Sequence, residues 1–294
     1  MRLLVELAIN GILMGSIYGL IALGLTLIFG IMKVINFAHG SFLMVGMFAT
    51  YWMCTLTGLD PYVSLLIVVP FCFCLGYLVQ NFLIKPVFKK EIKVREPIGV
   101  LLLTSGLWMF MDNTTLAIFG ASYRTVKTPY AQVSYQLGDI LLSAPQLYAF
   151  IGTIIATFCM YVFLRRTSLG KAIRATGQDR NTAELMGVNT YRIYNIAFGV
   201  GIALTGLAGG LLTPFFYIYP TVGFSFDIKA FIIVVLGGLG SIPGAILGGI
   251  IIGLIESVAA QFMTSTLTIV LAYVVFLLVL LFKPEGLFGF KGEW

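Results

Sequence analysis

Residues 4–30 read LVELAINGILMGSIYGLIALGLTLIFG, and this run decides what kind of fold the chain adopts. Its one charged residue is Glu6, and it is longer than the roughly 20 apolar residues that a membrane-spanning helix needs. A removable signal peptide has a shorter apolar core followed by a cleavage site, which this run lacks. We therefore expect it to remain in the protein as a spanning helix.

Similar apolar segments recur along the rest of the chain. They cover residues 34–56, 62–84, 98–119, 146–164, 192–212, 230–256 and 266–282. Continuous apolar runs are typical of spanning helices, whereas strands of a membrane β-barrel show only a weak alternation. The sequence thus predicts an all-α integral membrane protein, a polytopic bundle of about eight transmembrane segments that forms one domain over residues 1–294.

The composition excludes several classes of function. Apolar residues make up 59% of the chain and charged residues 10%, whereas a soluble domain has about 45–50% and 25%. No room is left for a soluble catalytic or nucleotide-binding domain. A net charge of +6 fits the excess of basic residues in cytoplasmic loops better than binding to nucleic acid. One histidine, and four cysteines inside apolar runs, predict no metal site.

The basic residues predict which loops face the cytoplasm. Loops 85–96 and 165–192 hold 11 of the 18 lysines and arginines, so both are expected inside. The linkers at 57–61, 120–145 and 213–229 are then external. Eight simple crossings would also leave the C-terminus outside.

Lys283 and Lys291 favour an internal C-terminus, so one apolar segment is expected not to cross simply. Segment 230–256 contains Gly-Gly-Leu-Gly-Ser-Ile-Pro-Gly at 237–244, where a broken helix could dip in and return. The stretch 31–40 interrupts another apolar region in a similar way. Irregular backbone at membrane depth is tolerated only inside protein or beside a cavity.

Paired interruptions of this kind point to a transport pathway, although packing of glycine-rich helices would also produce them. The candidate pathway residues are Asn36, His39, Gly40, Ser41, Gly240, Ser241, Pro243 and Gly244. Small residues at four-residue spacing form three further ridges that allow close helix contact, within the chain or with a partner. These ridges are Gly11, Gly15 and Gly19; Gly206 and Gly210; and Gly240, Gly244 and Gly248.

Few polar side chains interrupt the apolar segments. Asn36 and His39 are three residues apart, and we expect them to share a helix face. Two roles are equally open for this pair. The side chains could line a pathway or control a bend, or they could form a hydrogen bond that only serves helix packing. For Asp112 and Asn113, a buried hydrogen bond between helices is favoured over a pathway role. Glu256 is expected at the membrane interface rather than in a pathway.

The polar segment 167–190 has helix signals of its own. Asp179 can cap a following turn and Gly187 can end it, which predicts a short helix at about 180–186 on the cytoplasmic face. Such a helix would dock a partner, or would lie on the surface without one. Gly170-Lys171-Ala172 lacks the upstream glycine and the hydroxyl of a phosphate-binding loop, so ATP is not expected to bind this chain.

These residues resemble the coupling region of bacterial ABC-importer permeases. The matching positions are Gly170, Lys171, Arg174, Ala175, Asp179, Ala183, Gly187 and Val188. Four further stretches, at 19–30, 35–40, 237–245 and 283–289, are similar to the LivH-type permease of branched-chain amino-acid importers. The resemblance covers essentially the whole chain.

The resemblance implies a transport subunit of the bacterial inner membrane that is not itself an enzyme and holds no cofactor. It would pair with a LivM-like permease, two cytoplasmic ATPases that bind ATP and magnesium, and an extracytoplasmic binding protein. Branched-chain amino acids are the usual substrates, and similar permeases carry other amino acids, urea or short amides. The alternative is an ion-coupled secondary transporter or channel, for which Asp112, His39 and Glu256 offer few mid-membrane ionisable groups.

Overall fold

A computed structural model describes residues 2–91, 98–137, 140–283 and 285–288. Some positions on which the sequence analysis draws lie outside these residues, namely Lys93, Arg95, Pro284, Gly289 and Lys291. The helices are α1 (Arg2–Met32), α2 (His39–Thr57), α3 (Pro61–Val79), the π-helical turn η1 (Gln80–Ile84), α4 (Lys85–Glu91), α5 (Ile98–Phe119), α6 (Ala144–Arg166), α7 (Ser168–Gln178), α8 (Arg180–Leu185), α9 (Thr190–Leu212), α10 (Val222–Gly237), α11 (Ile242–Phe262) and α12 (Ser265–Phe282). Strands β1 (Ser134–Leu137) and β2 (Ile140–Ser143) form an antiparallel hairpin.

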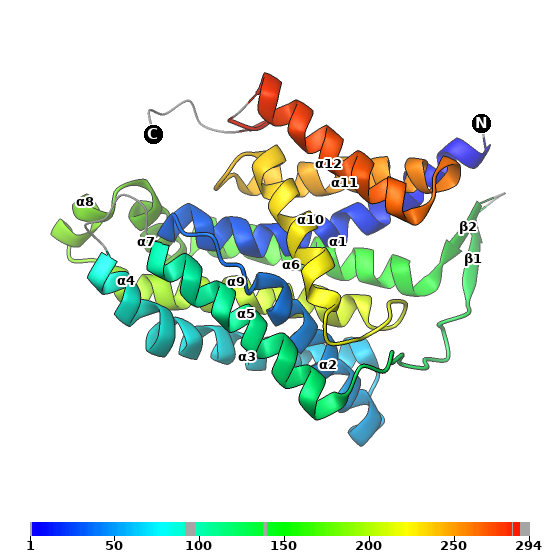
Figure 1. The fold of residues 1–294 in the computed structure, drawn as a ribbon, viewed down its shortest axis with the longest axis horizontal. Coiled ribbons are helices and arrows are strands. Elements are labelled where there is room, and N and C mark those ends of the chain that lie inside the picture. The colour runs from blue at the N-terminus through cyan, green and yellow to red at the C-terminus, as the bar shows by residue number, and fades with distance from the viewer. Residues whose placement is uncertain (1, 92–97, 138–139, 284, 289–294) are drawn as a thin grey trace.

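Helices α1 and α9 form the centre of the bundle. α1 lies along α11, α3 lies along α9, and α2 contacts both α9 and α10 (Figure 1). The glycine ridge of α1 makes the first contact possible, because a methyl group on Gly15 would lie 2.7 Å from the carbonyl oxygen of Gly249. A methyl group on Gly46 of α2 would likewise lie 2.6 Å from Cα of Gly206 in α9. These ridges therefore pack within the chain.

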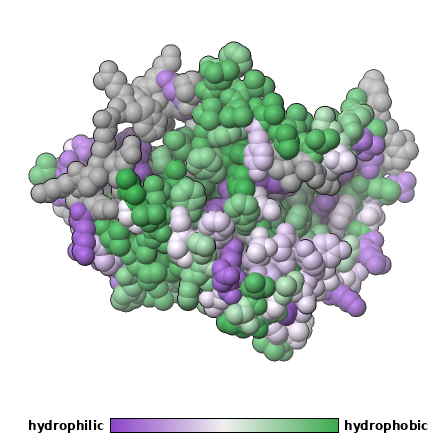
Figure 2. Space-filling model, viewed as in Figure 1, coloured by the Kyte–Doolittle hydropathy of each residue, from purple (hydrophilic) through white to green (hydrophobic). Residues whose placement is uncertain are grey.

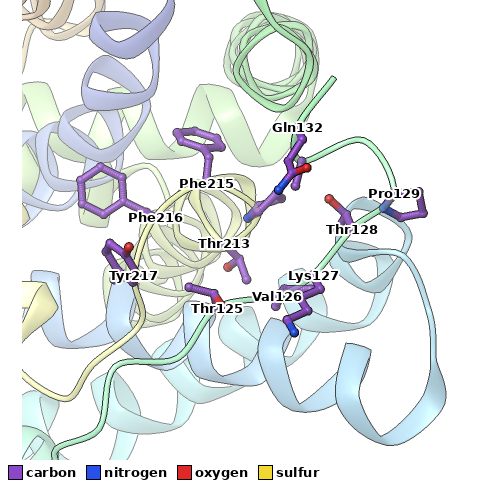
Figure 3. A pocket seen from close by; sticks show the side chains of 12 residues that line it. Thr125, Val126, Lys127, Thr128, Pro129, Gln132, Thr213, Phe215, Phe216 and Tyr217 are labelled. Carbon is purple, nitrogen blue, oxygen red and sulfur yellow. The ribbon is translucent and has the colours of Figure 1, made fainter. Parts of the chain in front are cut away.

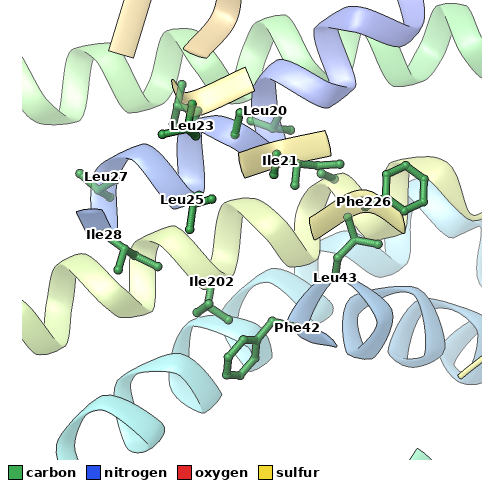
Figure 4. Close-up of a cluster of buried hydrophobic side chains, with 14 of the residues drawn as sticks. Leu20, Ile21, Leu23, Leu25, Leu27, Ile28, Phe42, Leu43, Ile202 and Phe226 are labelled. Atoms are coloured by element: carbon green, nitrogen blue, oxygen red, sulfur yellow. The ribbon is translucent and has the colours of Figure 1, made fainter. Parts of the chain in front are cut away.

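The core gathers around these contacts. Figure 4 shows Ile21 and Ile28 of α1, Phe42 of α2, Ile202 of α9 and Phe226 of α10 directed into one cluster. Each of these side chains is at most 3% exposed. Elements far apart in sequence are thus joined by one apolar interior.

The outer surface is also apolar. Within the described residues, five helices are long and apolar enough to cross a membrane: Leu3–Met32, Pro61–Lys90, Ala144–Arg166, Thr190–Leu212 and Ile242–Phe262. Large hydrophobic side chains are exposed on several of them, and Figure 2 shows wide green areas on the visible face. A surface of this kind suits lipid, so the chain is a multi-pass membrane protein.

The polar linkers separate into two groups, as the sequence predicts. At the hairpin end, which carries β1 and β2, the Tyr130 hydroxyl donates to Asp60 (2.7 Å), and the Arg124 N–H donates to the Ile218 carbonyl (2.9 Å). At the opposite end, which carries α4, α7 and α8, Lys89 and Arg180 both lie over the ring of Tyr191. We call the latter the α7–α8 end.

The apolar segment 230–256 is divided between two helices. α10 ends at Gly237 and α11 begins at Ile242, so the chain turns back at 238–241 as the glycine pattern predicts. α10 already begins at Val222, inside the stretch 213–229 that the sequence analysis treats as a linker. The segment that follows α12 returns to the end of α10, because the Leu287 N–H donates to the Leu236 carbonyl (2.8 Å). Dividing 230–256 into two helices thus adds one pass through the bundle.

Candidate functional site

Segment 167–190 forms two consecutive helices rather than the single one that the sequence predicts. Thr167 caps α7 by accepting from the Gly170 N–H (2.9 Å), and Asp179 caps α8 by accepting from the Asn181 N–H (2.9 Å). Gly187 follows α8 with φ +83°, a backbone conformation that favours glycine. The predicted short helix at 180–186, with its cap and its end, is confirmed.

Charged and hydroxyl groups hold α8 against the start of α9. Glu184 pairs with Arg180 (3.0 Å) and accepts a hydrogen bond from the Thr190 hydroxyl (2.6 Å). These interactions, the Thr190 hydrogen bond first, hold the pKa of Glu184 below its ordinary value. Leu185 and Met186, at the tip of the segment, are 87% and 80% exposed. A turn that is held by an ion pair and a hydrogen bond thus exposes two apolar side chains to the solvent.

α7 is fastened to the bundle along one face. Ile173 is buried, and a methyl group on Gly170 would lie 2.5 Å from Cα of Leu164 in α6. The opposite face carries exposed Lys171, Arg174 and Ala175. Of the candidate coupling residues, these three, Asp179 and Gly187 are exposed and accessible to a partner. Val188 is half-buried, whereas Ala183 is buried and Gly170 positions the helix.

The end of α7 meets the turn between α10 and α11 through the end of α1. A methyl group on Gly177 would lie 3.0 Å from the carbonyl oxygen of Gly30, and one on Gly240 would lie 3.4 Å from the Gly30 Cα. Ser241 caps α11 by accepting from the Gly244 N–H (3.2 Å), and Pro243 is exposed in its first turn. The second group of candidate pathway residues therefore builds a turn beside the coupling segment.

Asn36 and His39 do not share a helix face, because α2 begins only at His39. The Asn36 side chain accepts from the Ala38 N–H (3.1 Å) and stabilises the non-helical stretch 33–38 before that helix. Its side-chain amide nitrogen is buried and has no partner within the described residues.

His39 lies inside the protein and not on a surface. Its Nε2 atom is 3.0 Å from the carbonyl oxygen of Ile21 and 2.9 Å from the Thr205 hydroxyl, so the ring links α1, α2 and α9. The side chain is 0% exposed. Of the two roles left open, this geometry favours the packing hydrogen bond.

Ser41 and Asp112 are in contact. The Ser41 hydroxyl donates to Asp112 Oδ1 (2.7 Å), and Trp108 Nε1 donates to Asp112 Oδ2 (2.8 Å). The carboxylate therefore joins α2 to α5, the arrangement that the sequence favours over a pathway role. Asn113 points elsewhere: it is exposed and bonds to Met109 of its own helix (2.7 Å).

Two charged residues of α10 were absent from the sequence predictions. Asp227 packs on the first turn of α2, because a methyl group on Gly40 would lie 2.8 Å from the Asp227 Cβ. Lys229 pairs with Glu256 of α11 (2.8 Å) and donates to the Tyr18 hydroxyl (3.1 Å). Both lie in the stretch 213–229 that the sequence analysis treats as an external linker, so the pattern gave no signal of a helix there.

The hairpin end carries a cavity of about 690 Å³ between two strips of chain, 125–132 and 213–217. Figure 3 shows Lys127, Gln132 and the rings of Phe215 and Phe216 around it. Nearby, burial and the Asp60 carboxylate raise the pKa of Tyr130, so its phenol keeps its proton and donates to Asp60. The loop is thereby anchored, and the cavity mixes ammonium, amide, hydroxyl and aromatic groups.

Sequence comparison connects this geometry to known proteins. The family model described as "Branched-chain amino acid transport system / permease component" matches residues 7–282. The high-affinity branched-chain amino acid transport system permease protein BraD of Pseudomonas aeruginosa is 31% identical over 96% of this chain and 94% of its own. The LivH permease of Escherichia coli K12 is 30% identical, with coverage of 95% and 94%.

A probable branched-chain amino acid transport permease LivH of Methanocaldococcus jannaschii is 28% identical over 95% of this chain and 91% of its own. Among solved structures, PsaBC from Streptococcus pneumoniae in complex with Fab superposes with a TM-score of 0.51. The match covers 95% of this chain and 92% of the other, at 11% identity. That last similarity concerns the fold alone.

Proposed function

The chain belongs to the branched-chain amino acid transport permease family, and from this membership we propose that it carries branched-chain amino acids across the bacterial inner membrane. It is a permease subunit of an ABC importer and works in a complex with other subunits. The proposed complex contains a second, LivM-like permease, two cytoplasmic ATPases that bind ATP and magnesium, and an extracytoplasmic binding protein.

The exposed tip of α8 is the observation that carries the coupling role. Leu185 and Met186 are exposed apolar side chains on a capped turn, and the preceding helix α7 carries the exposed cation Arg174. A tip of this shape suits insertion into a groove of a cytoplasmic ATPase. The contact of Gly177 with Gly30, and of Gly30 with Gly240, offers a path from that tip to α1 and to the turn between α10 and α11.

The mechanism that fits this path is alternating access. ATP binding in the partner subunits would displace α7 and α8, and the ends of α1, α10 and α11 would follow because their backbones are in contact. The central helices would then rock and open the pathway between the two permeases to one side or the other. The hairpin end, with its cavity, would receive substrate from the binding protein.

Substrate choice is the part that depends most on other chains. Among the relatives, BraD and LivH are described as branched-chain amino acid permeases. Leu, Ile and Val suit the apolar interior, and the same permease would pass other small amino acids or amides if its binding protein delivered them. Binding measurements on the cognate binding protein test this point directly.

The coupling role is tested by Arg174→Glu and Gly187→Pro in the assembled complex. Charge reversal removes a surface cation, and proline cannot adopt the positive φ of Gly187, so both should abolish substrate-stimulated ATPase activity and uptake. Lys90→Glu, a charge reversal at an exposed cation of α4 that lies at the same end but outside the coupling segment, is the matched control. Normal assembly with full stimulated activity in both variants would refute coupling through this segment.

Co-purification separates the proposal from its alternative. An importer permease should be recovered with two nucleotide-binding subunits and should transport nothing alone. Transport by the lone chain in liposomes would instead establish the ion-coupled transporter or channel.

A further inference from the structure

One face of the bundle is unsuited to lipid, and we propose that the second permease covers it. This front face consists of the stretch 33–38, the middle of α5 with Trp108 and Asp112, and the first half of α10 with Phe224 and Asp227. Figure 1 shows stretch 33–38 between α5 and α10 on the side toward the viewer. The inference rests on the proposed function, because it names the surface through which that function's permease pair forms.

The first argument is charge. Asp112 stands seven residues before the end of α5, about 10 Å along the helix axis, and so lies inside the apolar segment 98–119 that the sequence predicts to cross the membrane. Asp227 packs against Gly40, the residue before the Ser41 that bonds to Asp112. Within the described part of the chain neither carboxylate forms an ion pair, since the pairs found there join Arg180 to Glu184 and Lys229 to Glu256. Charged groups at membrane depth face protein or water, not hydrocarbon.

The second argument is the backbone. Stretch 33–38 is not helical, and the Phe37 N–H bonds to the hydroxyl of Thr104, six residues into α5. This position is about 9 Å inside the helix by its axial rise. The Phe37 side chain is 42% exposed, so the stretch is partly uncovered. Irregular backbone at this depth is tolerated only against protein or a water-filled space.

The third argument is the side chains around these groups. Phe224 is 47% exposed and stacks on Trp108 with ring centroids 5.3 Å apart. Exposed aromatic side chains beside buried polar groups are typical anchors of protein interfaces. Figure 2 shows pale and purple residues interrupting the apolar surface in this region. The front face therefore combines exposed aromatic anchors with two carboxylates that form no ion pair within the described part of the chain.

The outer faces of α6 and α3 differ from the front face. α6 exposes apolar side chains along its length, among them Ile154, Ile155 and Phe158, and α3 exposes Leu66 and Phe71. Lipid covers such surfaces at no cost. The contrast assigns the second permease to the front face and lipid to the outer faces of α3 and α6. The partner should offer hydrogen-bond donors or a cation opposite Asp227.

Photocrosslinking in membranes tests the assignment. A photoreactive phenylalanine analogue replaces Phe224 or Phe37 on the front face, and Phe158 or Phe71 as controls of comparable exposure, 65% and 49% against 47% and 42%. The full importer is expressed with an epitope on the second permease. We expect irradiation to shift the front-face variants to the summed mass of the two permeases, and to leave the control variants unshifted.

Three results would overturn the assignment while the second permease still co-purifies. They are an adduct with it from Phe158 or Phe71, an adduct of the front face only with another copy of this chain, and no permease adduct from any of the four positions. Failure of a second permease to co-purify at all is a different result, since it refutes the proposed permease pair itself.

Discussion

At the scale of single residues, alanine substitutions at two glycines test whether a glycine is needed for close helix packing. A methyl group on Gly15 would lie 2.7 Å from the Gly249 carbonyl oxygen, whereas nothing lies within 4 Å of one on Gly106. We expect Gly15→Ala to lose about 1–3 kcal/mol of stability through overpacking of α1 on α11. Gly106→Ala should be neutral or gain about 0.5–1 kcal/mol of helix propensity. Thermal unfolding of the purified complex in detergent measures both, and equal melting temperatures would contradict the packing role.

The ion pair between Lys229 and Glu256 gives a second test at this scale. Its side chains are 20% and 14% exposed, so each charge relies on the other. Lys229→Met should cost about 1.5–3 kcal/mol because it leaves Glu256 unpaired. The double variant Lys229→Met with Glu256→Gln should recover part of that loss, since no lone charge remains. Thermal unfolding of the single and double variants measures the cycle; a double variant less stable than Lys229→Met would contradict it.

Residues whose partners are near in sequence were predictable, and residues whose partners are distant were not. Asp179 and Gly187 act on neighbouring backbone, so the pattern around them predicts α8. Lys229 pairs with a residue 27 positions away and with Tyr18, 211 positions away. Because Lys229 is charged, the sequence analysis assigned it to a linker. A single sequence does not reveal partners that are this distant.

At the scale of elements, the cap of α8 should control whether the coupling segment stays ordered. Asp179 accepts from the backbone of Asn181 and Thr182, and the Thr182 hydrogen bonds keep its pKa below the ordinary value. Asp179→Ala should speed hydrogen exchange across 181–187 and lower stimulated ATPase activity, whereas Asp179→Asn keeps an accepting oxygen and should change little. Identical exchange in both variants would show that the cap is dispensable.

The same cap predicts a direction for pH. Because the folded-state pKa of Asp179 is depressed, its stabilisation is present above the ordinary value of about 3.9 and is lost as pH falls through the folded-state pKa. Exchange across α8 should therefore be unchanged between neutral pH and about pH 5, after correction for intrinsic rates. It should rise only in stronger acid.

The C-terminal motif acts on the turn between α10 and α11. The Leu287 and Phe288 N–H groups donate to the carbonyls of Leu236 and Gly237, and a methyl group on Gly286 would lie 2.5 Å from the Gly238 nitrogen. Gly286 has φ +77°. Gly286→Ala should thus release the tail as well as strain the backbone, and limited proteolysis should cut it faster.

Gly58→Ala is the matched control for this prediction. Gly58 has φ +70° and nothing within 4 Å of an added methyl group, so its variant carries the backbone strain alone. Equal rates of tail cleavage in the two variants would contradict a fastened tail.

At the scale of the whole molecule, the helical membrane fold and the turn at 237–244 followed from apolar run lengths and glycine spacing. Two features did not follow. α10 was hidden because Asp227 and Lys229 break its apolar run, and its burial depends on α2 and α11. The pairing of β1 with β2 was missed because the two strands are four residues each, too short for a reliable alternation pattern.

The extra pass made by α10 and α11 also predicts the sidedness of the termini. α1 contacts β2, and Figure 1 shows its N-terminal end on the side of the hairpin, whereas its last turn meets Gly177 near the basic helices. Basic loops favour the cytoplasm, so the N-terminus should be external and the C-terminus internal. With the native cysteines replaced, Leu3→Cys should react with an impermeant maleimide in intact cells. Leu185→Cys should react only after permeabilisation. Labelling of Leu185→Cys in intact cells would show the opposite topology, in which no cytoplasmic ATPase could contact α8.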